Sequence, residues 1–230
     1  MTTREAILQQ VRAGVAEGNR LADIPALPER EGVGYQGAGD DAVRRFCDEL
    51  KAAGGQAHVA ADADSACRIA LDLLRSHGVR KAVLSRCELV ERLDLAQRLR
   101  EADIGVQKAG DGDRDNLFAA DAGISGVYRL IAETGTMVMM TSPEQPRSVS
   151  LLPPLHIAFA DSSQLLPDLF DLFDLFSPTA DAPACLTLIT GPSKTGDIEL
   201  RLVTGVHGPG EVHVVLIDSA GEPPGLTRRS

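Results

Sequence analysis

The chain has 230 residues, of which 43% are hydrophobic, so it is long enough to bury a substantial core as one large domain or as a domain with an appendage. Acidic residues outnumber basic ones by 33 to 23 and the net charge is -10, which argues against a nucleic-acid-binding surface. No apolar run approaches the roughly 18 residues that span a membrane, and the N-terminus lacks the apolar core of a signal peptide. We therefore expect a cytoplasmic protein.

The spacing of the four cysteines indicates whether this chain could hold a zinc ion or an iron–sulfur cluster. Cys47, Cys67, Cys87 and Cys185 are widely spaced, and no Cys-x-x-Cys pair occurs. Zinc and iron–sulfur sites built within one chain normally draw on such pairs. We expect reduced cysteines that pack in the core, and the sequence predicts no metal site.

The first 39 residues differ from the rest of the chain. Thr2 and Glu5 are spaced as a capping box, and the apolar side chains that follow lie on one face of a helix that Gly18 would end. Residues 19–39 contain prolines and glycines typical of an irregular linker. This helix is expected to dock on its own domain or on another subunit.

From Asp40 onward, helix-like and strand-like segments alternate. Each helix is predicted from a capping residue followed by apolar side chains at helical spacing, and each strand from a short apolar run. Such repeated units need crossover connections, which favours a mostly parallel sheet covered by helices. The predicted elements are a helix from Asp40 or Asp41 that Gly54 ends, a strand at 56–60, a helix from Asp64 or Ser65 that Gly78 ends, a strand at 81–84, a helix at 89–100 and a strand at 105–107.

The second half contains more strand and fewer long helices. Four runs, at 137–140, 155–160, 185–190 and 212–217, are apolar on both faces, as central strands are. One helix is predicted between them, from about Asp161 to Phe176, with Pro178 just beyond its end.

Six ordered segments stand out in the second half of the chain: Ala122–Ser125, Ile131–Thr136, Arg147, Ser150–Ile157, Gly191–Glu199 and Gly205–Pro209. Together they resemble the LUD-domain proteins of the LutC/YkgG type, and ordered blocks are more specific than any single short motif. We therefore expect residues 1–39 as helix and linker, residues 40–220 as the LUD domain and residues 221–230 as a tail.

The resemblance also implies a fold and a role. The fold would be a three-layer α/β/α arrangement with a mostly parallel sheet, related to sugar-phosphate isomerases and CoA transferases. The role would be in L-lactate utilisation, beside two companion proteins that hold iron–sulfur clusters and with which it oxidises L-lactate to pyruvate. No cofactor is expected in this chain, and four unpaired cysteines fit that division because the usual cluster needs four thiolates.

Glu133 is a candidate catalytic residue at the start of the strand at 137–140. Beside it, Thr134, Gly135 and Thr136 are candidate binding residues, since their hydroxyls and backbone suit a carboxylate or phosphate while Glu133 transfers a proton. In the alternative interpretation, Glu133 caps a helix or pairs with Arg147, and the threonines and glycine shape the entry to the strand.

Arg147 and His156 are further candidate binding residues. Arg147 follows a loop with two prolines that would hold its guanidinium for bidentate recognition of a carboxylate, although a surface ion pair with Glu144 is the alternative. His156 enters an apolar strand, where a histidine is more often a hydrogen-bonded core residue than a ligand.

The segment at 191–199 combines polar side chains with glycines at a strand end and is a plausible anion site. Glycines are missing at the positions that a Walker A motif requires, which argues against a P-loop ATPase. A solvated lysine is the alternative for Lys194, and Asp197 would otherwise cap a helix or pair with Arg201. The candidate binding residues are Gly191, Ser193, Lys194, Thr195 and Asp197.

His207 is flanked by glycines and is the second candidate catalytic residue, the alternative being a tight turn between strands. We expect the loops of Glu133, Arg147, Lys194 and His207 to meet at one edge of the sheet. Three classes of function stay open: a subunit of an iron–sulfur lactate-oxidising complex, an autonomous enzyme of the CoA-transferase or isomerase type acting on a small carboxylate or phosphate, and a scaffold without chemistry.

Overall fold

The computed structural model describes residues 3–18, 37–111, 117–176, 183, 185–196 and 203–218. The chain divides into two units, Met1–Tyr35 and Gln36–Ser230. In the first unit, α1 (Thr3–Gly18) forms the predicted helix, and its apolar side chains Ile7, Leu8, Val11 and Val15 are exposed. Most of the predicted linker and all of the predicted tail lie outside the described residues.

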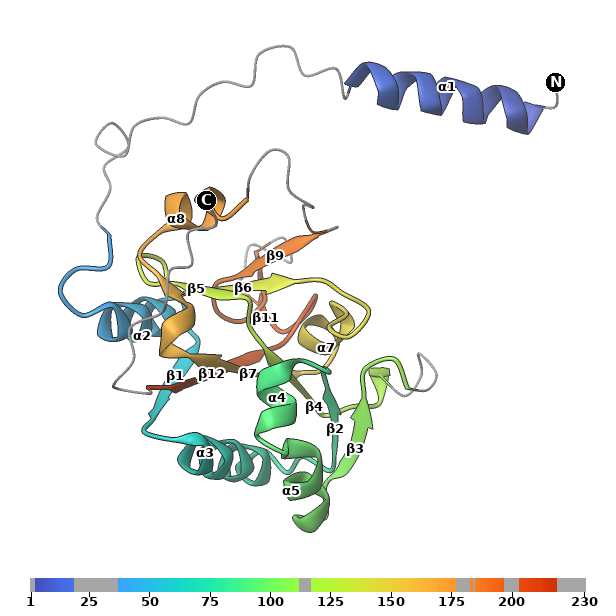
Figure 1. The fold of residues 1–230 in the computed structure, drawn as a ribbon. Coiled ribbons are helices and arrows are strands. Elements are labelled where there is room, and N and C mark those ends of the chain that lie inside the picture. The colour runs from blue at the N-terminus through green and yellow to red at the C-terminus, as the bar shows by residue number, and fades with distance from the viewer. Residues whose placement is uncertain are drawn as a thin grey trace. The chain divides into compact units, whose positions relative to one another are not determined.

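A six-stranded sheet forms the centre of the second unit, and every neighbouring pair of its strands is parallel (Figure 1). In spatial order the strands are β1 (Gln56–Ala60), β12 (Glu211–Ile217), β7 (Leu155–Asp161), β4 (Ala122–Gly126), β2 (Lys81–Leu84) and β3 (Gly105–Lys108). The middle strands β12, β7 and β4 are buried on both faces, which explains the continuous apolar runs of β12 and β7. β4 contains two glycines and a serine and was not among the predicted strands.

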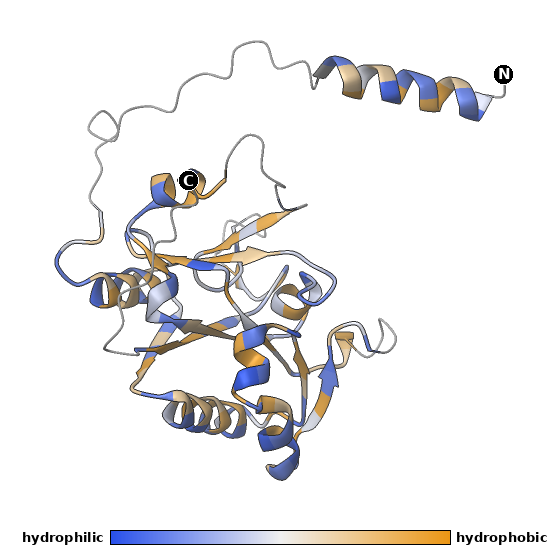
Figure 2. Cartoon of the chain, viewed as in Figure 1, coloured by the Kyte–Doolittle hydropathy of each residue, from blue (hydrophilic) through white to orange (hydrophobic). Residues whose placement is uncertain are grey.

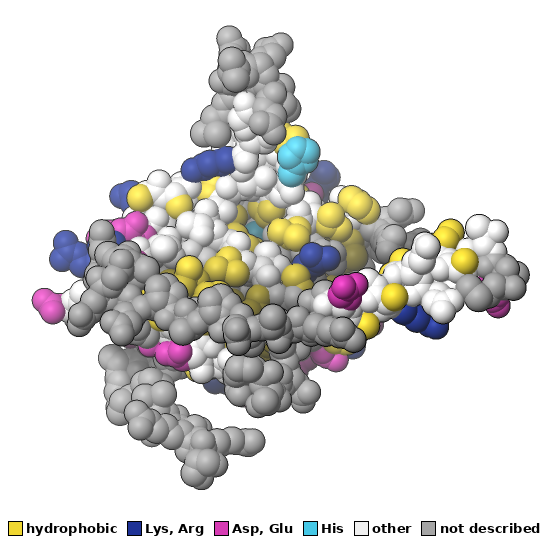
Figure 3. All heavy atoms as spheres, turned by 90° about the horizontal axis from the view of Figure 1, so that it is seen from above, with side chains coloured by type: hydrophobic (Ala, Val, Ile, Leu, Met, Phe, Trp, Pro, Cys, Tyr) yellow, Lys and Arg dark blue, Asp and Glu magenta, His cyan; other side chains and the backbone are white. Residues whose placement is uncertain are grey.

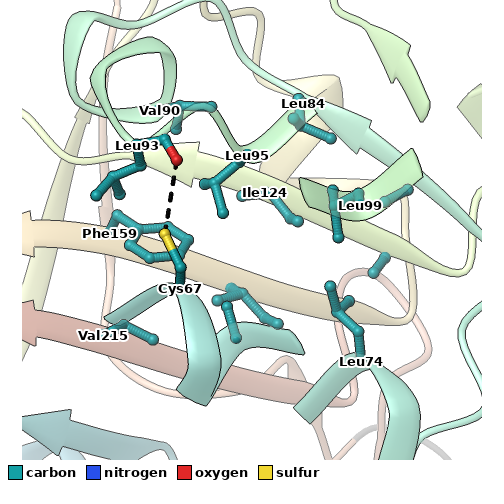
Figure 4. Packing of buried hydrophobic residues seen from close by; sticks show 14 of the residues in the cluster. Cys67, Leu74, Leu84, Val90, Leu93, Leu95, Leu99, Ile124, Phe159 and Val215 are labelled. Carbon is teal, nitrogen blue, oxygen red and sulfur yellow. Dashed lines mark hydrogen bonds between the residues drawn. The ribbon is translucent and has the colours of Figure 1, made fainter. Parts of the chain in front are cut away.

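Three helices cover one face of this sheet: α3 (Ala63–Ser76), α4 (Glu88–Arg92) and α5 (Leu95–Glu101). Figure 2 shows polar and apolar residues alternating along α3, as expected for a helix with one buried side. Figure 4 shows the core beneath these helices, where the Sγ of Cys67 donates to the backbone oxygen of Leu93 at 3.6 Å. Burial raises the pKa of the Cys67 thiol, so this cysteine packs as a neutral core residue, as predicted.

The opposite face carries α2 (Ala42–Ala52) and a smaller sheet. The other elements on this side are β5 (Arg129–Ile131), β6 (Thr136–Met140), β8 (Leu165–Leu166), β9 (Leu186–Ile189), α7 (Ser148–Leu151) and α8 (Leu169–Asp174). The small sheet has the strand order β8-β5-β6-β9; β6 pairs antiparallel with both of its neighbours, and β5 pairs parallel with β8. Leu188 of β9 and Phe173 of α8 are exposed hydrophobic residues, and Figure 3 shows apolar side chains on the outer side of the small sheet.

The fold is therefore α/β with a mostly parallel central sheet flanked by helices, as the sequence predicts. The helix caps are also close to prediction. Asp41 accepts a hydrogen bond from the Arg44 amide at 2.9 Å and caps α2. The cap of α3 is Asp62 rather than Asp64 or Ser65, because Asp62 and Ser65 form a reciprocal capping box.

Two helix predictions are wrong in extent. The helix expected at 89–100 is two helices, since Asp94 adopts a left-handed conformation with φ of 47° between them. The helix expected from 161 to 176 shrinks to α8, preceded by a 3-10 turn (Ser162–Gln164) and β8. Pro167 ends the earlier segment because it restricts the residue before it, and Asp168 caps α8 through the Phe170 and Asp171 amides.

Two of the four expected central strands lie elsewhere. β6 and β9 pair antiparallel with each other in the small mixed sheet and do not belong to the parallel one. Their apolar faces pack partly on the central sheet and partly on α8, so burial on both sides reflects neighbouring layers rather than a central position. The runs at 155–160 and 212–217 form β7 and β12, as predicted.

Close backbone contacts at two glycines hold the small sheet against α2 and hold β4 against α7. Gly135, in the turn between β5 and β6, has φ of +62°, and a Cβ there would overlap the backbone of Glu49 and Leu50 in α2. Gly123 in β4 lies against α7, where a Cβ would overlap the backbone oxygen of Val149. Both positions need a residue without a side chain because another main chain occupies the space.

We predict that Gly135→Ala destabilises the protein more than Gly78→Ala. Both glycines have φ of +62°, but nothing lies within 4 Å of a Cβ at Gly78. The left-handed conformation alone costs about 1–2 kcal/mol. Overlap with α2 should add about 1–3 kcal/mol for Gly135→Ala. Urea unfolding of both variants measures the difference, and equal losses would contradict the contact with α2.

Candidate functional site

A cleft lies at the carboxyl ends of the central strands, where ligands bind in open α/β sheets. Its volume is about 330 Å³. A second hollow of about 170 Å³ adjoins it and shares Cys87 and Val127 with it. We call the first of these the carboxyl-end cleft. It is lined by Cys87, Glu88, Leu89, Arg92, Gly126, Val127, Asp161, Ser163 and Gln164.

One wall of the carboxyl-end cleft is the segment that follows β2. The Ser85 amide extends the sheet by donating to the Ile124 oxygen at 2.9 Å, and the buried Ser85 hydroxyl lies 3.5 Å from the Cys87 Sγ. The Arg86 amide donates to the Glu144 oxygen at 2.8 Å, and the Arg86 side chain forms an ion pair with Asp111. These bonds fix the course of the chain from the strand end to Cys87.

The other wall follows β7. Asp161 accepts from the Ser163 amide at 3.0 Å, and Gln164 donates to the Val127 oxygen at 2.7 Å. Arg92 is the basic side chain of this lining, and it is exposed with no ion-pair partner among the residues described. The lining of the cleft thus combines a guanidinium with a thiol and two carboxyl groups, and the guanidinium is the group of this set that could bind a small anion.

These lining residues were not predicted as a site from the sequence. The pattern that could have indicated them is the polar run Ser85-Arg86-Cys87 directly after a buried strand, since parallel strand ends in this fold class present ligand-binding loops. Cys87 was instead assigned to packing, because its spacing from the other cysteines matched no known ligand set.

The predicted residues around Glu133 lie elsewhere, in the turn between β5 and β6. Thr134 and Thr136 bond through their hydroxyls at 2.7 Å, and Thr136 bonds to the Thr190 hydroxyl at 2.6 Å. Gly135 packs on α2, and the half-buried Glu133 donates its amide to the Pro167 oxygen at 3.0 Å. In this arrangement the threonine hydroxyls bond to one another and join the β5–β6 turn to the end of β9.

The predicted anion loop packs against the end of α2. Lys194 donates through Nζ to the backbone oxygen of Ala53 at 2.5 Å, and a Cβ on Gly191 would lie 2.7 Å from that same oxygen. Lys194 therefore neutralises the carbonyl end of a helix. Thr195 pairs with Val203 in a short ladder between β10 (Lys194–Thr195) and β11 (Val203–Thr204). Asp197 lies outside the described residues.

His207 is exposed in the turn that leads into β12. This turn contacts the previous loop, because the Ser193 amide donates to the Pro209 oxygen and the Gly205 amide donates to the Ser193 oxygen, both at 2.9 Å. The loops of Glu133, Lys194 and His207 thus follow one another along the amino ends of the central strands. We call residues 133–136, 190–196 and 205–210 the amino-end loops.

Arg147 does not join the amino-end loops, so the expected meeting of four loops holds for three. It is exposed at the start of α7, with Nη1 3.9 Å from the Cys185 Sγ. It lines a small hollow with Met140 and Ser125, at the opposite end of β6 from Thr136. Arg147 therefore lies on the side of the carboxyl-end cleft.

His156 is fully buried in β7 and accepts or donates a hydrogen bond with the Ser125 hydroxyl at 2.8 Å. Burial lowers its pKa to about 4, so the imidazole is neutral at pH 7. Its Nδ1 has no hydrogen-bond partner within the described part of the chain. His156 therefore has the surroundings of a hydrogen-bonded core histidine, the expected alternative to a ligand.

A group of potential metal ligands lies outside the carboxyl-end cleft, at the amino end of β12 directly after the amino-end loop 205–210. His77, Glu211 and His213 each offer one ligand atom, and these atoms lie within 4.8 Å of one another. None of the four cysteines belongs to such a group in the described chain. This group was not predicted from the sequence, because its members come from separate elements.

A family model for the LUD domain matches residues 43–217. "Lactate utilization protein C" of Anoxybacillus flavithermus is 32% identical over 148 residues, which is 63% of this chain and 66% of that protein. The protein of the same name from Bacillus subtilis is 38% identical over 121 residues, 51% of this chain and 48% of that protein. "Uncharacterized protein YkgG" of Escherichia coli is 32% identical over 160 residues, 66% of this chain and 69% of that protein.

The matched segments thus span less than two thirds of the two named lactate utilization proteins. A solved structure, that of a DUF162 family protein from Deinococcus radiodurans, superposes with a TM-score of 0.56 at 20% identity. It covers 76% of this chain and 96% of its own, which supports the fold. In the described residues, no helix has the length and apolar character of a membrane span.

We predict that His156 makes stability depend on pH. Its pKa is 6.5 in the unfolded chain and about 4 in the fold, so the unfolded chain takes up the proton first as the pH falls. The stability is full above pH 6.5 and declines by about 3 kcal/mol on the way to pH 4. His156→Gln removes this contribution, so its free energy of unfolding should approach that of the wild type as the pH falls.

Urea unfolding at pH 7, 5.5 and 4 measures this convergence. Ser125→Ala is the control, because it loses the hydrogen bond but keeps the buried imidazole, and should retain the wild-type slope. A gap between wild type and His156→Gln that stays constant with pH would contradict the low pKa.

Proposed function

Because this chain belongs to the LUD-domain family, we propose that it functions in lactate utilisation, as the subunit of an iron–sulfur complex that oxidises L-lactate to pyruvate. The observation that carries the proposal is the set of matched relatives named lactate utilization protein C. In this proposal the chain supplies a binding surface or part of the substrate site, and its companions supply the clusters.

The chemistry of lactate oxidation supports placing the iron–sulfur clusters in the companion proteins. Oxidation of lactate to pyruvate removes two electrons and two protons, so an electron acceptor is required. The usual iron–sulfur cluster is held by four thiolates. Here Cys47 lies in α2, Cys67 in α3, Cys87 before α4 and Cys185 before β9, on separate elements. This arrangement supports a cluster in the companion proteins rather than in this chain.

The carboxyl-end cleft is the proposed place for the substrate. Lactate carries a carboxylate, which a guanidinium binds with two parallel hydrogen bonds. Arg92 is exposed in the cleft lining, and Arg147 lies on the same side of the molecule. Glu88 and Asp161 in that lining are the groups able to accept the proton of the substrate hydroxyl.

The proposed contact with companion proteins is α1. Its exposed apolar residues recur at helical spacing along one face, as in helices that bind a partner. The proposed compartment is the cytoplasm, where thiols stay reduced, in keeping with four cysteines that form no disulfide.

We predict that Arg92→Gln weakens lactate oxidation by a complex reconstituted from this chain and its iron–sulfur companions. Loss of a bidentate carboxylate contact should raise the KM for lactate roughly 10-fold or more, corresponding to about 1.5–3 kcal/mol. Lactate-dependent dye reduction measures the rate. Arg44→Gln is the matched control, since Arg44 is an exposed arginine on α2 that is not part of the cleft lining.

Glu133→Gln and Lys194→Ala test the amino-end loops in the same assay. A larger effect of these two variants than of Arg92→Gln would move the substrate site to the amino-end loops. Full activity of the companions without this chain would contradict the subunit proposal. Turnover of a small carboxylate or phosphate ester by the isolated chain would favour an autonomous enzyme, and co-purification without any change of rate would favour a scaffold.

A further inference from the structure

Three of the five histidines in the chain meet beside Glu211 at the amino end of β12. Glu211 and His213 are two residues apart on β12 and therefore point to the same face. Gln56 of β1 is opposite His213, so His58 lies diagonally across on that face. His77 is the residue that ends α3, the helix covering this face. Three elements thus bring the four side chains together.

The hydrogen bonds of His77 leave one ring nitrogen facing Glu211. Its Nδ1 lies 2.7 Å from the Leu73 backbone oxygen, and because that oxygen only accepts, Nδ1 carries the hydrogen. Its Nε2 lies 2.7 Å from the Glu211 Oε2. A backbone oxygen that holds one imidazole nitrogen while the other faces outward is the usual support of a metal-binding histidine.

His213 presents a second nitrogen to the same carboxylate. Its side chain is 1% exposed, and its Nδ1 lies 3.1 Å from the His58 Nε2. Its Nε2 has no hydrogen-bond partner within the described residues and lies 3.6 Å from the Glu211 Oε2. A buried nitrogen left without a partner costs about 1–3 kcal/mol, and a cation between it and Glu211 would remove that cost.

We propose that His77, His213 and Glu211 bind one divalent transition-metal ion of the zinc class, with His58 holding the ring of His213. Bond lengths of about 2.0–2.2 Å put the ligand atoms of a tetrahedral site about 3.3–3.6 Å apart. The 3.6 Å separation between His213 Nε2 and Glu211 Oε2 lies at the upper end of this range. The 2.7 Å separation between His77 Nε2 and Glu211 Oε2 is shorter, so these two exposed side chains would move apart to admit the ion. Two imidazoles and one carboxylate suit Zn²⁺ and its neighbours better than Ca²⁺ or Mg²⁺, which prefer oxygen ligands.

The site would leave a coordination position open. His77 and Glu211 are both exposed, so the ion would face solvent on one side. Three protein ligands and an open fourth position are typical of catalytic zinc sites, whereas structural zinc sites are closed. The bound ion would also join the end of α3 to the start of β12. This proposal is independent of the carboxyl-end cleft and of lactate oxidation.

The test is titration of the full-length, chelator-treated protein with ZnCl₂, followed by calorimetry. We expect one ion per chain. Glu211→Gln and His77→Gln each remove a ligand at an exposed position, and the affinity should fall at least 10-fold in both. His58→Gln removes only the support of His213, and a loss of about 10-fold is expected. His207→Gln, an exposed histidine outside the group, should bind Zn²⁺ as the wild type does.

Thermal unfolding gives a second readout that does not depend on activity. Zn²⁺ should raise the Tm of the wild type and of His207→Gln, because an ion that binds only the folded state stabilises it. The shift should disappear in Glu211→Gln and His77→Gln. If the wild type binds no Zn²⁺, or if these two variants bind it with unchanged affinity, the group is a hydrogen-bonded cluster and the proposal is wrong.

Discussion

Contact between main chains at Gly123 and Gly135 holds together the layers on the α2 side of the central sheet. At Gly123 the α7 backbone touches β4, which places Arg147 and fixes the start of β7. At Gly135 the turn of the small sheet touches α2, which brings Thr136 within reach of Thr190. Because a side chain at either glycine would push whole elements apart, these contacts determine where the loops of both sheet ends lie.

The sequence predicted most of the parallel sheet, since β1, β2, β3, β7 and β12 follow clear apolar runs or helix–strand units. The prediction was wrong where tertiary contacts, and not the local sequence pattern, determine the structure. β6 is as apolar as a central strand of the parallel sheet, yet it is buried between layers as a strand of the small mixed sheet. Pro167 was overlooked in an apolar stretch whose spacing fitted a helix, although a proline there favours a break.

The candidate sites were less predictable because they depend on which strand ends become neighbours. Arg147 and Lys194 were both selected from polar loops, but only the fold shows that they lie at opposite ends of β6, and that Lys194 bonds to α2. The histidines at 58, 77 and 213 are isolated in the sequence. Their meeting requires the β1–β12 register, which no local pattern contains.

The position of β12 has a consequence for how the protein is made. β12 is the last described strand in the sequence, yet it lies between β1 and β7, and β1 pairs with no other described strand. During synthesis on the ribosome, β1 and α2 must wait for residues 211–217 to emerge before they can join the sheet. Until then the apolar face of α2, with Phe46 and Leu50, lacks its partners Val212, Val214 and Leu216, and a nascent chain is open to chaperone binding there.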